Sequence, residues 1–561
     1  MLSKIATLLK RVGAREFRLA PPEHDRFGEY ATNAALLVAR SRKTSPLESA
    51  ERMRAELLSI APKGLIKDIR VAPPGFINFF LSDRALRDVV SRVAREGALY
   101  GSSREGRNRT IIVEYPSVNI AKPMHVGHLR SAILGGALAN LHDFLGYRVV
   151  RWDYLGDWGT QFGKLIAAYK RWGSRREVLA DPIGSLLALY VRFHAEMKAD
   201  PELALAGREE FRKLEAGDRE NRRLWRWFRD ASLKEFGRFY RLIGVRSDVK
   251  IGESFFEDKM SAIGRALAKK KLLEESEGAL IVRLDGEGLP PALVRKSDGA
   301  SLYLTRDLAS LFYRIREYHP AKILYVVSNE QALYLEQVFA VARRVRTVSA
   351  DVVHVKFGLV LGEGGRKFST RDGGAVSAEA IIAEAIRRAR AVVEKKNPKL
   401  PEREKERVAR AVGIGAVTYN DLSQYRTSDI VFNWETMLSF TGDSAPYLQY
   451  TYARLKSVLR KAPRARAATT GGPFAESERL VARELLYVPE AIRRAATEYA
   501  PNILADRLFK LANAVNFFYE SEPILKAPKE ERAVRLAIVE ASAIALKTGL
   551  GLLGIEAVER M

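Results

Sequence analysis

Cysteine is absent from this sequence of 561 residues. Its absence excludes disulfide bonds, catalysis by a thiolate and zinc sites with cysteine ligands. Histidine is also scarce, and the seven histidines are spread too widely to indicate a metal site of another kind. We therefore predict that the protein itself forms no metal site and that its chemistry comes from other side chains.

Long apolar runs are missing as well. A helix that crosses a membrane needs roughly 20 consecutive apolar residues, and no such run occurs in the sequence. Residues 1–11 also lack the uninterrupted apolar core of a signal peptide. The hydrophobic content is nevertheless 47%. We expect a soluble, cytoplasmic protein without membrane contact, folded into two or three domains.

Acidic residues are outnumbered by basic ones. The chain has 93 Lys and Arg against 68 Asp and Glu, which gives a net charge of +25. In a folded chain without repeats, this balance favours a polyanionic partner such as a nucleic acid. The alternative is a source organism whose proteins are basic in general.

The stretch Pro123-Met124-His125-Val126-Gly127-His128 predicts a phosphate site. It stands between an apolar run at 111–113, typical of a buried strand, and a helical pattern at 129–145. Unpaired N–H groups at the start of a helix attract anions, the glycine lets a ligand approach the backbone, and histidines can donate hydrogen bonds to phosphoryl oxygens. The alternative is that both histidines only cap the helix.

Residues 1–100 have the pattern of a small α+β domain, followed by a polar linker at 101–109. Asn78 lies inside a predicted strand, where it could reach the edge of a nucleic-acid base. A hydrogen bond from Asn78 to neighbouring backbone is the simpler interpretation. The predicted elements are helices around 5–9, at 30–40 and at 49–59, and strands at 67–71 and 76–80 on either side of a Pro-Pro-Gly turn.

From 110 to 372 predicted strands alternate with helices, which is typical of a parallel α/β sheet. Helical, highly charged residues at 181–245 interrupt this order, and we interpret them as an insertion. Aromatic side chains in the insertion have the spacing of core residues rather than of residues that stack on bases. Further strands are predicted at 148–152, 280–284, 302–304, 323–328 and 352–361, and the aromatic residues with this spacing are Trp225, Trp227, Phe228, Phe236, Phe239 and Tyr240.

A Gly-rich loop at 362–374 carries Lys367, Arg366 and Arg371. Such a loop could close over a polyphosphate and meet its charge, or it could be a solvated hairpin. After about residue 378 the pattern is helical, and the segment 501–519 has one apolar face that predicts a helical bundle. This face consists of Leu504, Leu508, Leu511, Ala512, Val515 and Phe518.

The order of the His-x-Gly-His loop, the later basic loop and the C-terminal helices resembles that of class I aminoacyl-tRNA synthetases. Residues Glu114–Ser131 are similar to the signature of arginyl-tRNA synthetases. Further matches to that family are 153–163, 303–307, 432–434, 445–450 with Ala453-Arg454, and the chain end from Gly549 to Met561. The resemblance implies an α/β fold: a Rossmann-like parallel-sheet catalytic domain at 101–400, a small N-terminal α+β domain at 1–100 that contacts tRNA, and a C-terminal α-helical anticodon-binding bundle at 401–561.

The resemblance also implies a pocket for arginine. Carboxylates accept the planar guanidinium fork through paired hydrogen bonds. A site that depends on such bonds rejects an analogue that lacks them by ~10⁴-fold. From the residues alone, each carboxylate could equally be an exposed surface charge. The implied pocket residues are Glu114, Asn119, Tyr303, Asp307 and Gln331.

ATP, carried with Mg²⁺, would bind beside this pocket. Thr370 stands where the family has a second lysine in the basic loop, and we expect Lys122 to compensate for it, with Arg371 sharing the charge. Tyr334 is a second departure, because the family often has histidine there. The resemblance implies His125, Gly127, His128, Lys367 and Ser369 for ATP binding, and His125, His128, Lys122 and Lys367 for catalysis.

The implied reaction is the ATP-dependent ligation of L-arginine to its cognate tRNA through an arginyl-adenylate, by positioning and charge stabilisation without a general base. We expect a monomer that must bind tRNA before the adenylate forms. A helix face packed on the catalytic domain is the alternative for the C-terminal tRNA contacts. The expected tRNA contacts are Asn78, Tyr447, Gln449, Tyr450 and Arg454.

Two other functions stay open from the sequence. One is a synthetase for another amino acid or a related nucleotidyltransferase, which would share the phosphate loops. The other is a catalytically silent RNA-binding paralogue. The complete set of ATP-site residues argues against the silent paralogue, because a binding protein does not need it.

Overall fold

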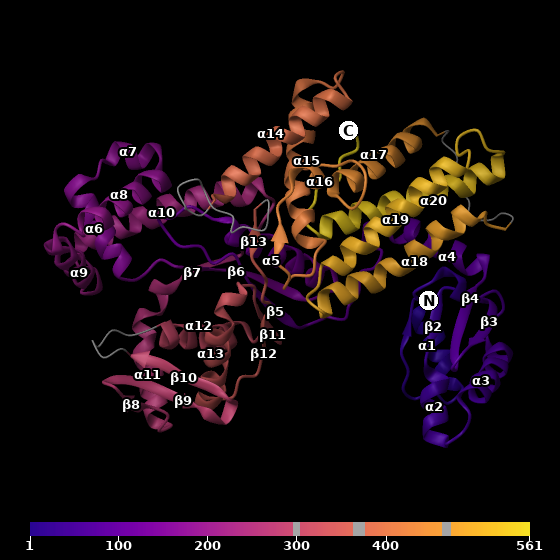
Figure 1. Cartoon of the computed structure of the whole chain (residues 1–561), viewed down its shortest axis with the longest axis horizontal. Helices are drawn as coiled ribbons and strands as arrows, with labels where there is room; N and C mark the ends of the chain where they lie inside the picture. The colour runs from indigo at the N-terminus through magenta and orange to yellow at the C-terminus, as the bar shows by residue number, and fades with distance from the viewer. Residues whose placement is uncertain (296–302, 363–375, 463–472) are drawn as a thin grey trace.

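The computed structural model describes residues 1–295, 303–362, 376–462 and 473–561. Figure 1 shows an elongated molecule, with the N-terminal sheet beneath the C-terminal helices at one end and the helices α6–α10 at the other. The central sheet lies between them. None of the helices in the described ranges combines the length and the apolar character that crossing a membrane requires.

The N-terminal part contains a four-stranded antiparallel sheet in the order β1-β2-β4-β3, covered by helices. Two of its strands confirm the predictions at 67–71 and 76–80. The helix predicted from residue 30 is wrong at its start, because Tyr30–Thr32 pairs with Phe79–Ile77 and buries Tyr30. The elements are α1 (Leu2–Arg11), β1 (Leu19–Ala20), β2 (Tyr30–Thr32), α2 (Ala34–Arg42), α3 (Pro46–Ile60), β3 (Ile66–Ala72), β4 (Phe76–Leu81) and α4 (Asp83–Glu96).

The central sheet has five parallel strands in the order β12-β11-β5-β6-β7. From β5 the chain adds β6 and β7 on one side and later adds β11 and β12 on the other. The carboxyl ends of β5 and β11 therefore form a topological switch point, where open α/β sheets bind their ligands. The strands are β5 (Thr110–Glu114), β6 (Arg148–Leu155), β7 (Val249–Gly252), β11 (Lys322–Tyr325) and β12 (Asp351–His354).

The segments between these strands are mainly helical. The strand predicted at 302–304 is wrong at Leu304, which lies in α12, while Leu302 lies outside the described residues. A small antiparallel sheet, in the order β10-β9-β8, packs beside α13. The elements are α5 (Val126–Phe144), α6 (Thr160–Trp172), α11 (Met260–Lys269), β8 (Glu274–Ser276), β9 (Ala279–Leu284), β10 (Leu289–Arg295), α12 (Tyr303–Tyr318) and α13 (Ala332–Val345).

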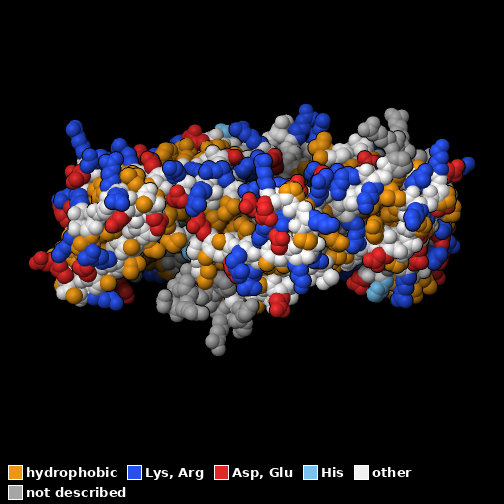
Figure 2. Space-filling view, turned by 90° about the horizontal axis from the view of Figure 1, so that it is seen from above, with side chains coloured by type: hydrophobic (Ala, Val, Ile, Leu, Met, Phe, Trp, Pro, Cys, Tyr) orange, Lys and Arg blue, Asp and Glu red, His pale blue; other side chains and the backbone are white. Residues whose placement is uncertain are grey.

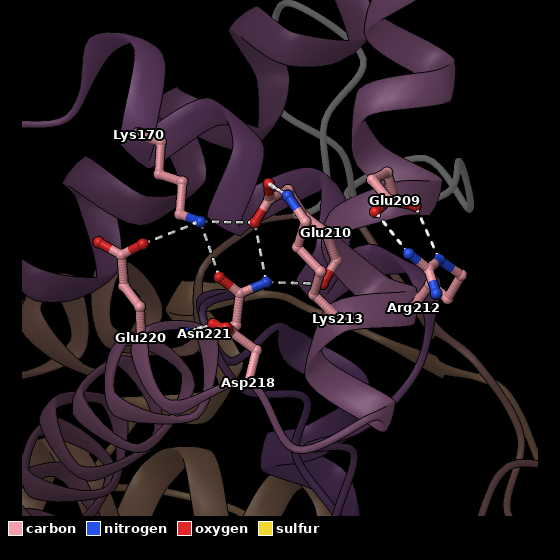
Figure 3. A network of polar contacts seen from close by, with 8 residues as sticks. All are labelled: Lys170, Glu209, Glu210, Arg212, Lys213, Asp218, Glu220 and Asn221. Carbon is pink, nitrogen blue, oxygen red and sulfur yellow. Dashed lines mark hydrogen bonds and ion pairs between the residues drawn. The ribbon is translucent and has the colours of Figure 1, made fainter.

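Four helices lie between α6 and β7 in the chain, and they include most of the insertion predicted at 181–245. Five of the six aromatic side chains on which the core interpretation rests are buried, which confirms it, and Trp227 is partly buried against them. Lys170 joins three helices by contacting Glu210 Oε2 at 2.6 Å and the buried Asn221 Oδ1 at 2.8 Å (Figure 3). The helices are α7 (Arg175–Ala180), α8 (Pro182–Glu196), α9 (Pro201–Glu215) and α10 (Arg219–Leu242).

The C-terminal part is helical as predicted, apart from β14, which pairs with β13. The predicted apolar face of 501–519 is confirmed, because all six of its residues are buried. Arg479 ties this part to the N-terminal domain through ion pairs of 2.6 Å to Glu29 and 2.7 Å to Asp83. The elements are β13 (Val360–Leu361), α14 (Ala378–Lys396), α15 (Glu402–Leu422), β14 (Ile430–Val431), α16 (Trp434–Met437), α17 (Ala445–Lys461), α18 (Glu476–Thr497), α19 (Asn502–Ser521) and α20 (Lys529–Leu552).

Candidate active site

A cavity of about 610 Å³ lies at the switch point of the central sheet. Glu114 and Tyr325, the last residues of β5 and β11, both line it. The start of α5 forms one part of its wall, and α12 and α13 form another. Its polar lining comes from Glu114, Ser117, Asn119, His125, His128, Ser131, Tyr154, Glu253, Asp307, Ser310, Arg314, Tyr325, Ser328, Glu330, Gln331 and Tyr334.

The two histidines of the predicted phosphate loop both line the cavity at the N-terminus of α5. His125 Nδ1 accepts a hydrogen bond from the N–H of Gly127 at 3.1 Å, and His128 Nδ1 accepts one from the N–H of His125 at 3.3 Å. The ring centroids lie 3.8 Å apart, and the ring planes are tilted by 33° to each other. Because Nδ1 is an acceptor in both rings, a neutral ring carries its proton on Nε2.

Burial keeps these histidines neutral. It lowers the pKa of His128 to about 3, with a contribution from His125, and it lowers the pKa of His125 as well. Each ring is therefore an uncharged Nε2–H donor at neutral pH. The helix capping that the sequence left as an alternative is real, and it fixes the tautomer that a phosphate ligand needs.

Helix α5 is anchored by Arg130, whose side chain is 1% exposed. Its guanidinium donates to the carbonyl of Leu359 at 2.9 Å and to the carbonyls of Arg426 and Ser428, both at 3.1 Å. It also forms an ion pair of 3.3 Å with Asp421 in α15. The end of the cavity that His125 and His128 line is thus fixed to α15 and to the backbone outside the helices.

The other part of the cavity is acidic. Glu114 is buried and forms an ion pair with Arg314, whose guanidinium lies 4.5 Å from the ring centre of Trp152. The Ser117 hydroxyl lies 3.4 Å from the other carboxylate oxygen of Glu114.

Asp307 projects from α12 toward the same space and accepts a hydrogen bond from the Tyr334 hydroxyl. Burial raises the pKa of Asp307 to about 6, and Glu114 raises it further, against the lowering effect of Tyr334. Burial also raises the pKa of Glu253 to about 8, although Arg306 at 3.6 Å opposes this rise. A cationic ligand would relieve the repulsion among these carboxyl groups.

Asn119 lines the cavity beside Gly156, whose lack of a side chain leaves room for it. The backbone on either side of Asn119 pairs with Gly156: Ile120 N donates to Gly156 O at 3.1 Å, and Gly156 N donates to Val118 O at 2.9 Å. A Cβ atom at Gly156 would lie 2.1 Å from Asn119 Oδ1. Gln331 lines the cavity from the turn before α13.

Two further groups indicate that the cavity is shaped for a polar ligand. The hydroxyls of Tyr154 and Ser310 line it, are buried, and have no hydrogen-bonding partner among the described residues. Leaving a buried hydroxyl unpaired costs free energy, which a bound ligand can recover. The sequence did not single out Tyr154, Ser310, Glu253 or Arg314, although Glu253 directly follows the carboxyl end of β7 and could have been found there.

Lys122 is not among the described residues that line the cavity. Lys122 is partly buried, and its Nζ lies 5.1 Å from the ring centre of Tyr190 in α8. The start of α14 lies close to the His125 end of the cavity, since Ala378 N donates to Met124 O at 2.8 Å. Lys367, Ser369, Thr370 and Arg371 lie outside the described residues, as does the side chain of Tyr303.

The residues expected to contact tRNA have different surroundings. Gln449 is fully buried, and its amide donates to the carbonyls of Ala411 at 3.1 Å and Glu556 at 2.7 Å. This position contradicts a base contact by Gln449, because its amide joins α17 to α15 and the chain end. Asn78 is 4% exposed and is equally unsuited to reach a base.

Tyr450 and Arg454 instead line a second cavity, of about 540 Å³, together with Arg460, Lys461 and Tyr519. The Arg454 guanidinium lies 4.9 Å from the ring centres of both Tyr450 and Tyr519. Tyr447 is partly buried, and its hydroxyl donates to Asn513 Oδ1 at 2.8 Å.

The parallel sheet, the switch-point cavity and the His-x-Gly-His helix start define the catalytic domain of a class I aminoacyl-tRNA synthetase. The family model "tRNA synthetases class I (R), catalytic domain" matches residues 89–434. The models "Arginyl tRNA synthetase N terminal domain" and "DALR anticodon binding domain" match residues 2–81 and 448–561.

Individual relatives agree with these matches. The arginine–tRNA ligase of Ligilactobacillus salivarius is 42% identical over 547 residues, covering 97% of this chain and 95% of the relative. That of Exiguobacterium sp. is 42% identical over 567 residues, covering 100% and 99%. The structure of Thermus thermophilus arginyl-tRNA synthetase superposes with a TM-score of 0.83 at 28% identity, covering 100% of this chain and 99% of that one.

The chain belongs to the arginyl-tRNA synthetase family, and it is an enzyme that ligates arginine to tRNA. The predicted resemblance and fold class are confirmed. Neither a synthetase for another amino acid nor a silent RNA-binding paralogue is supported.

Proposed function

We propose that the switch-point cavity catalyses both steps of arginine transfer to tRNA. In the first step a carboxylate oxygen of L-arginine attacks the α-phosphorus of ATP, an O–P bond forms, and pyrophosphate leaves. In the second step a hydroxyl of the terminal adenosine of tRNA attacks the arginyl carbonyl, and AMP leaves. The division of the cavity into an Nε2–H donor end and an acidic end carries this proposal.

At the acidic end, Glu114 and Asp307 would hold the guanidinium. Asn119, Gln331 and Tyr303 would complete the arginine pocket. Two ionised carboxylates can each accept N–H groups of the planar fork, whereas the compact ammonium of lysine offers no such geometry. The raised pKa of Asp307, to about 6, supports this role, because burial and the nearby Glu114 both disfavour its negative charge and a bound cation would offset them.

At the other end, His125, Gly127 and His128 would hold ATP phosphates, helped by the N-terminus of α5. We assign Lys367 and Ser369 of the basic loop to ATP as well, and Lys122 to the charge that develops on pyrophosphate. Mg²⁺ would accompany the ATP phosphates. Charge stabilisation and positioning suffice for the attack, so no general base is assigned.

For tRNA, we propose a division of labour between domains. Residues 1–100 and the helices at 401–561, which lie together at one end of the molecule, would bind tRNA beside the catalytic domain at 101–400, which carries the helical insertion around 181–245. Tyr450 and Arg454, which share a cavity with Arg460 and Lys461, are suited to stacking on an unstacked base and holding its phosphate. Tyr447 lies on the same helix, α17. Lys and Arg side chains occur along the whole length of the face shown in Figure 2, interspersed with acidic groups.

A monomer in the cytoplasm is the state that we propose for this activity. One chain supplies both ends of the cavity, which supports a monomer. The cytoplasm is where aminoacylated tRNA is used in translation, which supports that location.

ATP–pyrophosphate exchange with arginine, measured with and without tRNA, tests the proposed steps. We expect exchange with arginine that depends on bound tRNA, and no exchange with lysine or glutamine. Exchange with lysine equal to that with arginine would contradict the pocket assignment. Exchange that is equally fast without tRNA would contradict the expected order of binding.

A further inference from the structure

Tyr334 and Asp307 form a contact that the family resemblance did not predict. The two residues come from different helices, α13 and α12, and both line the arginine end of the cavity. The Tyr334 hydroxyl donates to Asp307 Oδ2. The other pocket carboxylate, Glu114, is held in a comparable way through its ion pair with Arg314.

We propose that Tyr334 is a positioning residue for arginine recognition, which holds one oxygen of Asp307 so that the second oxygen is presented to the substrate guanidinium. This inference rests on the proposed role of Asp307 in arginine binding. Tyr334 itself does not need to touch the substrate.

The surroundings of Asp307 explain why an internal donor matters. Burial and the nearby Glu114 raise the pKa of Asp307, whereas Arg306 and Arg314 lower it. The neighbouring Arg306 is directed to Glu253 at 3.6 Å and to Glu257 at 2.8 Å. The Tyr334 hydroxyl therefore favours the ionised form of Asp307 and fixes its rotation at the same time.

Rotation of the carboxylate determines specificity. A guanidinium forms strong bonds only with acceptors in its plane, whereas an ammonium accepts many directions. If Asp307 were free to rotate, arginine would lose more binding free energy than lysine. Tyr334 thus contributes to discrimination between these two cations.

Tyr334→Phe is the direct test, because it removes one hydroxyl and keeps the ring. A hydrogen bond to a charged group is strong enough that we expect the KM for arginine to rise about 10-fold or more, with the KM for ATP within about 2-fold of wild type. Discrimination against lysine should fall. Tyr334→His supplies a ring N–H at the same place and should restore part of the arginine affinity.

Tyr419→Phe is a matched control. Its hydroxyl also bonds a carboxylate, Asp443, at 2.6 Å, but in the C-terminal part of the chain, where it lies 3.2 Å from the carbonyl of Ala505 as well. Both variants should lose similar thermal stability, and only Tyr334→Phe should raise the KM for arginine. Equal arginine KM values in the two variants would overturn the inference.

Asp307→Asn separates this inference from the proposed function. If Asp307→Asn raises the KM for arginine and Tyr334→Phe does not, Tyr334 has no positioning role while the pocket assignment stands. If Asp307→Asn also leaves the KM for arginine unchanged, the pocket assignment itself is wrong. Should Tyr334→Phe fold poorly, Tyr334→Leu, which also lacks a donor, decides in its place, because an unchanged arginine KM and unchanged lysine discrimination in that variant would overturn the inference.

Discussion

Lowering the pH from 7 to 5 should weaken the binding of arginine about tenfold, because Asp307 takes up a proton in this interval. Its pKa is raised to about 6, mainly by burial. The carboxyl group is then about 90% ionised at pH 7 and about 10% ionised at pH 5. Since the guanidinium binds the ionised form, the affinity follows this fraction, which corresponds to ~1.4 kcal/mol.

Other charged groups that face Asp307 change little in this range. Glu253 has a pKa of about 8, so it is mostly protonated at both pH values, and His128, with a pKa of about 3, stays neutral. Arg306 and Arg314 keep their charge, and burial raises the pKa of Tyr334, which stays protonated. Asp307 therefore sets the direction of the pH dependence. Because the pKa of its carboxyl group is raised to about 6, the affinity for arginine is lost as the pH falls through this value.

Isothermal titration calorimetry with L-arginine alone is the suitable assay, because ATP phosphates titrate in the same range. Near pH 6, binding should also release about half a proton per arginine, which appears as a dependence of the heat on the buffer. In Asp307→Asn the pH dependence should largely disappear. Equal affinities at pH 5 and pH 7 in the wild-type protein would refute this reasoning.

Two further predictions concern packing. Gly156→Ala should raise the KM for arginine severalfold with little change in the KM for ATP, because its Cβ would lie 2.1 Å from Asn119 Oδ1 and displace that side chain; steady-state kinetics measure both constants. Lys170→Met should lower the free energy of unfolding by about 1–3 kcal/mol, because the buried Asn221 loses a charged partner, and chemical denaturation measures the loss. Lys213→Met is its control, because Lys213 is more exposed and should cost less than about 1 kcal/mol.

These packing predictions fail in distinguishable ways. A normal arginine KM in Gly156→Ala would show that Asn119 is not needed in the pocket or can move without cost. Equal losses of stability in Lys170→Met and Lys213→Met would show that the network in Figure 3 contributes no more than a surface ion pair.

The sequence predicts those parts of the fold that depend on local pattern. The apolar run at 111–113 identifies β5, and the spacing of Leu504, Leu508 and Leu511 identifies the buried face of α19. The strand β2 was missed because Tyr30–Thr32 precedes a helical pattern directly. Its extended conformation depends on pairing with Phe79–Ile77, far away in the sequence.

In the site too, local motifs identify some residues, whereas others depend on contacts that are distant in the sequence. Glu114, Asn119, Asp307 and the two histidines were found through motifs, and the structure brings them to one cavity. Arg314 was not found, because on an amphipathic helix it resembles an exposed charge. It is buried only because Glu114, Trp152 and Tyr325 meet around it from three strands.

Gln449 was predicted to contact tRNA, but the structure buries it. A polar residue in a family motif on a helix suggests a ligand contact, but its burial depends on where the chain end comes to lie. The carbonyl of Glu556 accepts a hydrogen bond from the Gln449 amide at 2.7 Å, and no local pattern around 449 contains that information.

A crystal structure with L-arginine bound is the most direct test of the division of the cavity into an acidic end and a phosphate end. The guanidinium nitrogens are predicted to lie about 2.7–2.9 Å from carboxylate oxygens of Glu114 and Asp307, as in other charge-assisted pairs. The α-carboxylate should point toward His125 and His128. A bound arginine whose guanidinium lies at the histidines, or away from both carboxylates, would contradict this assignment.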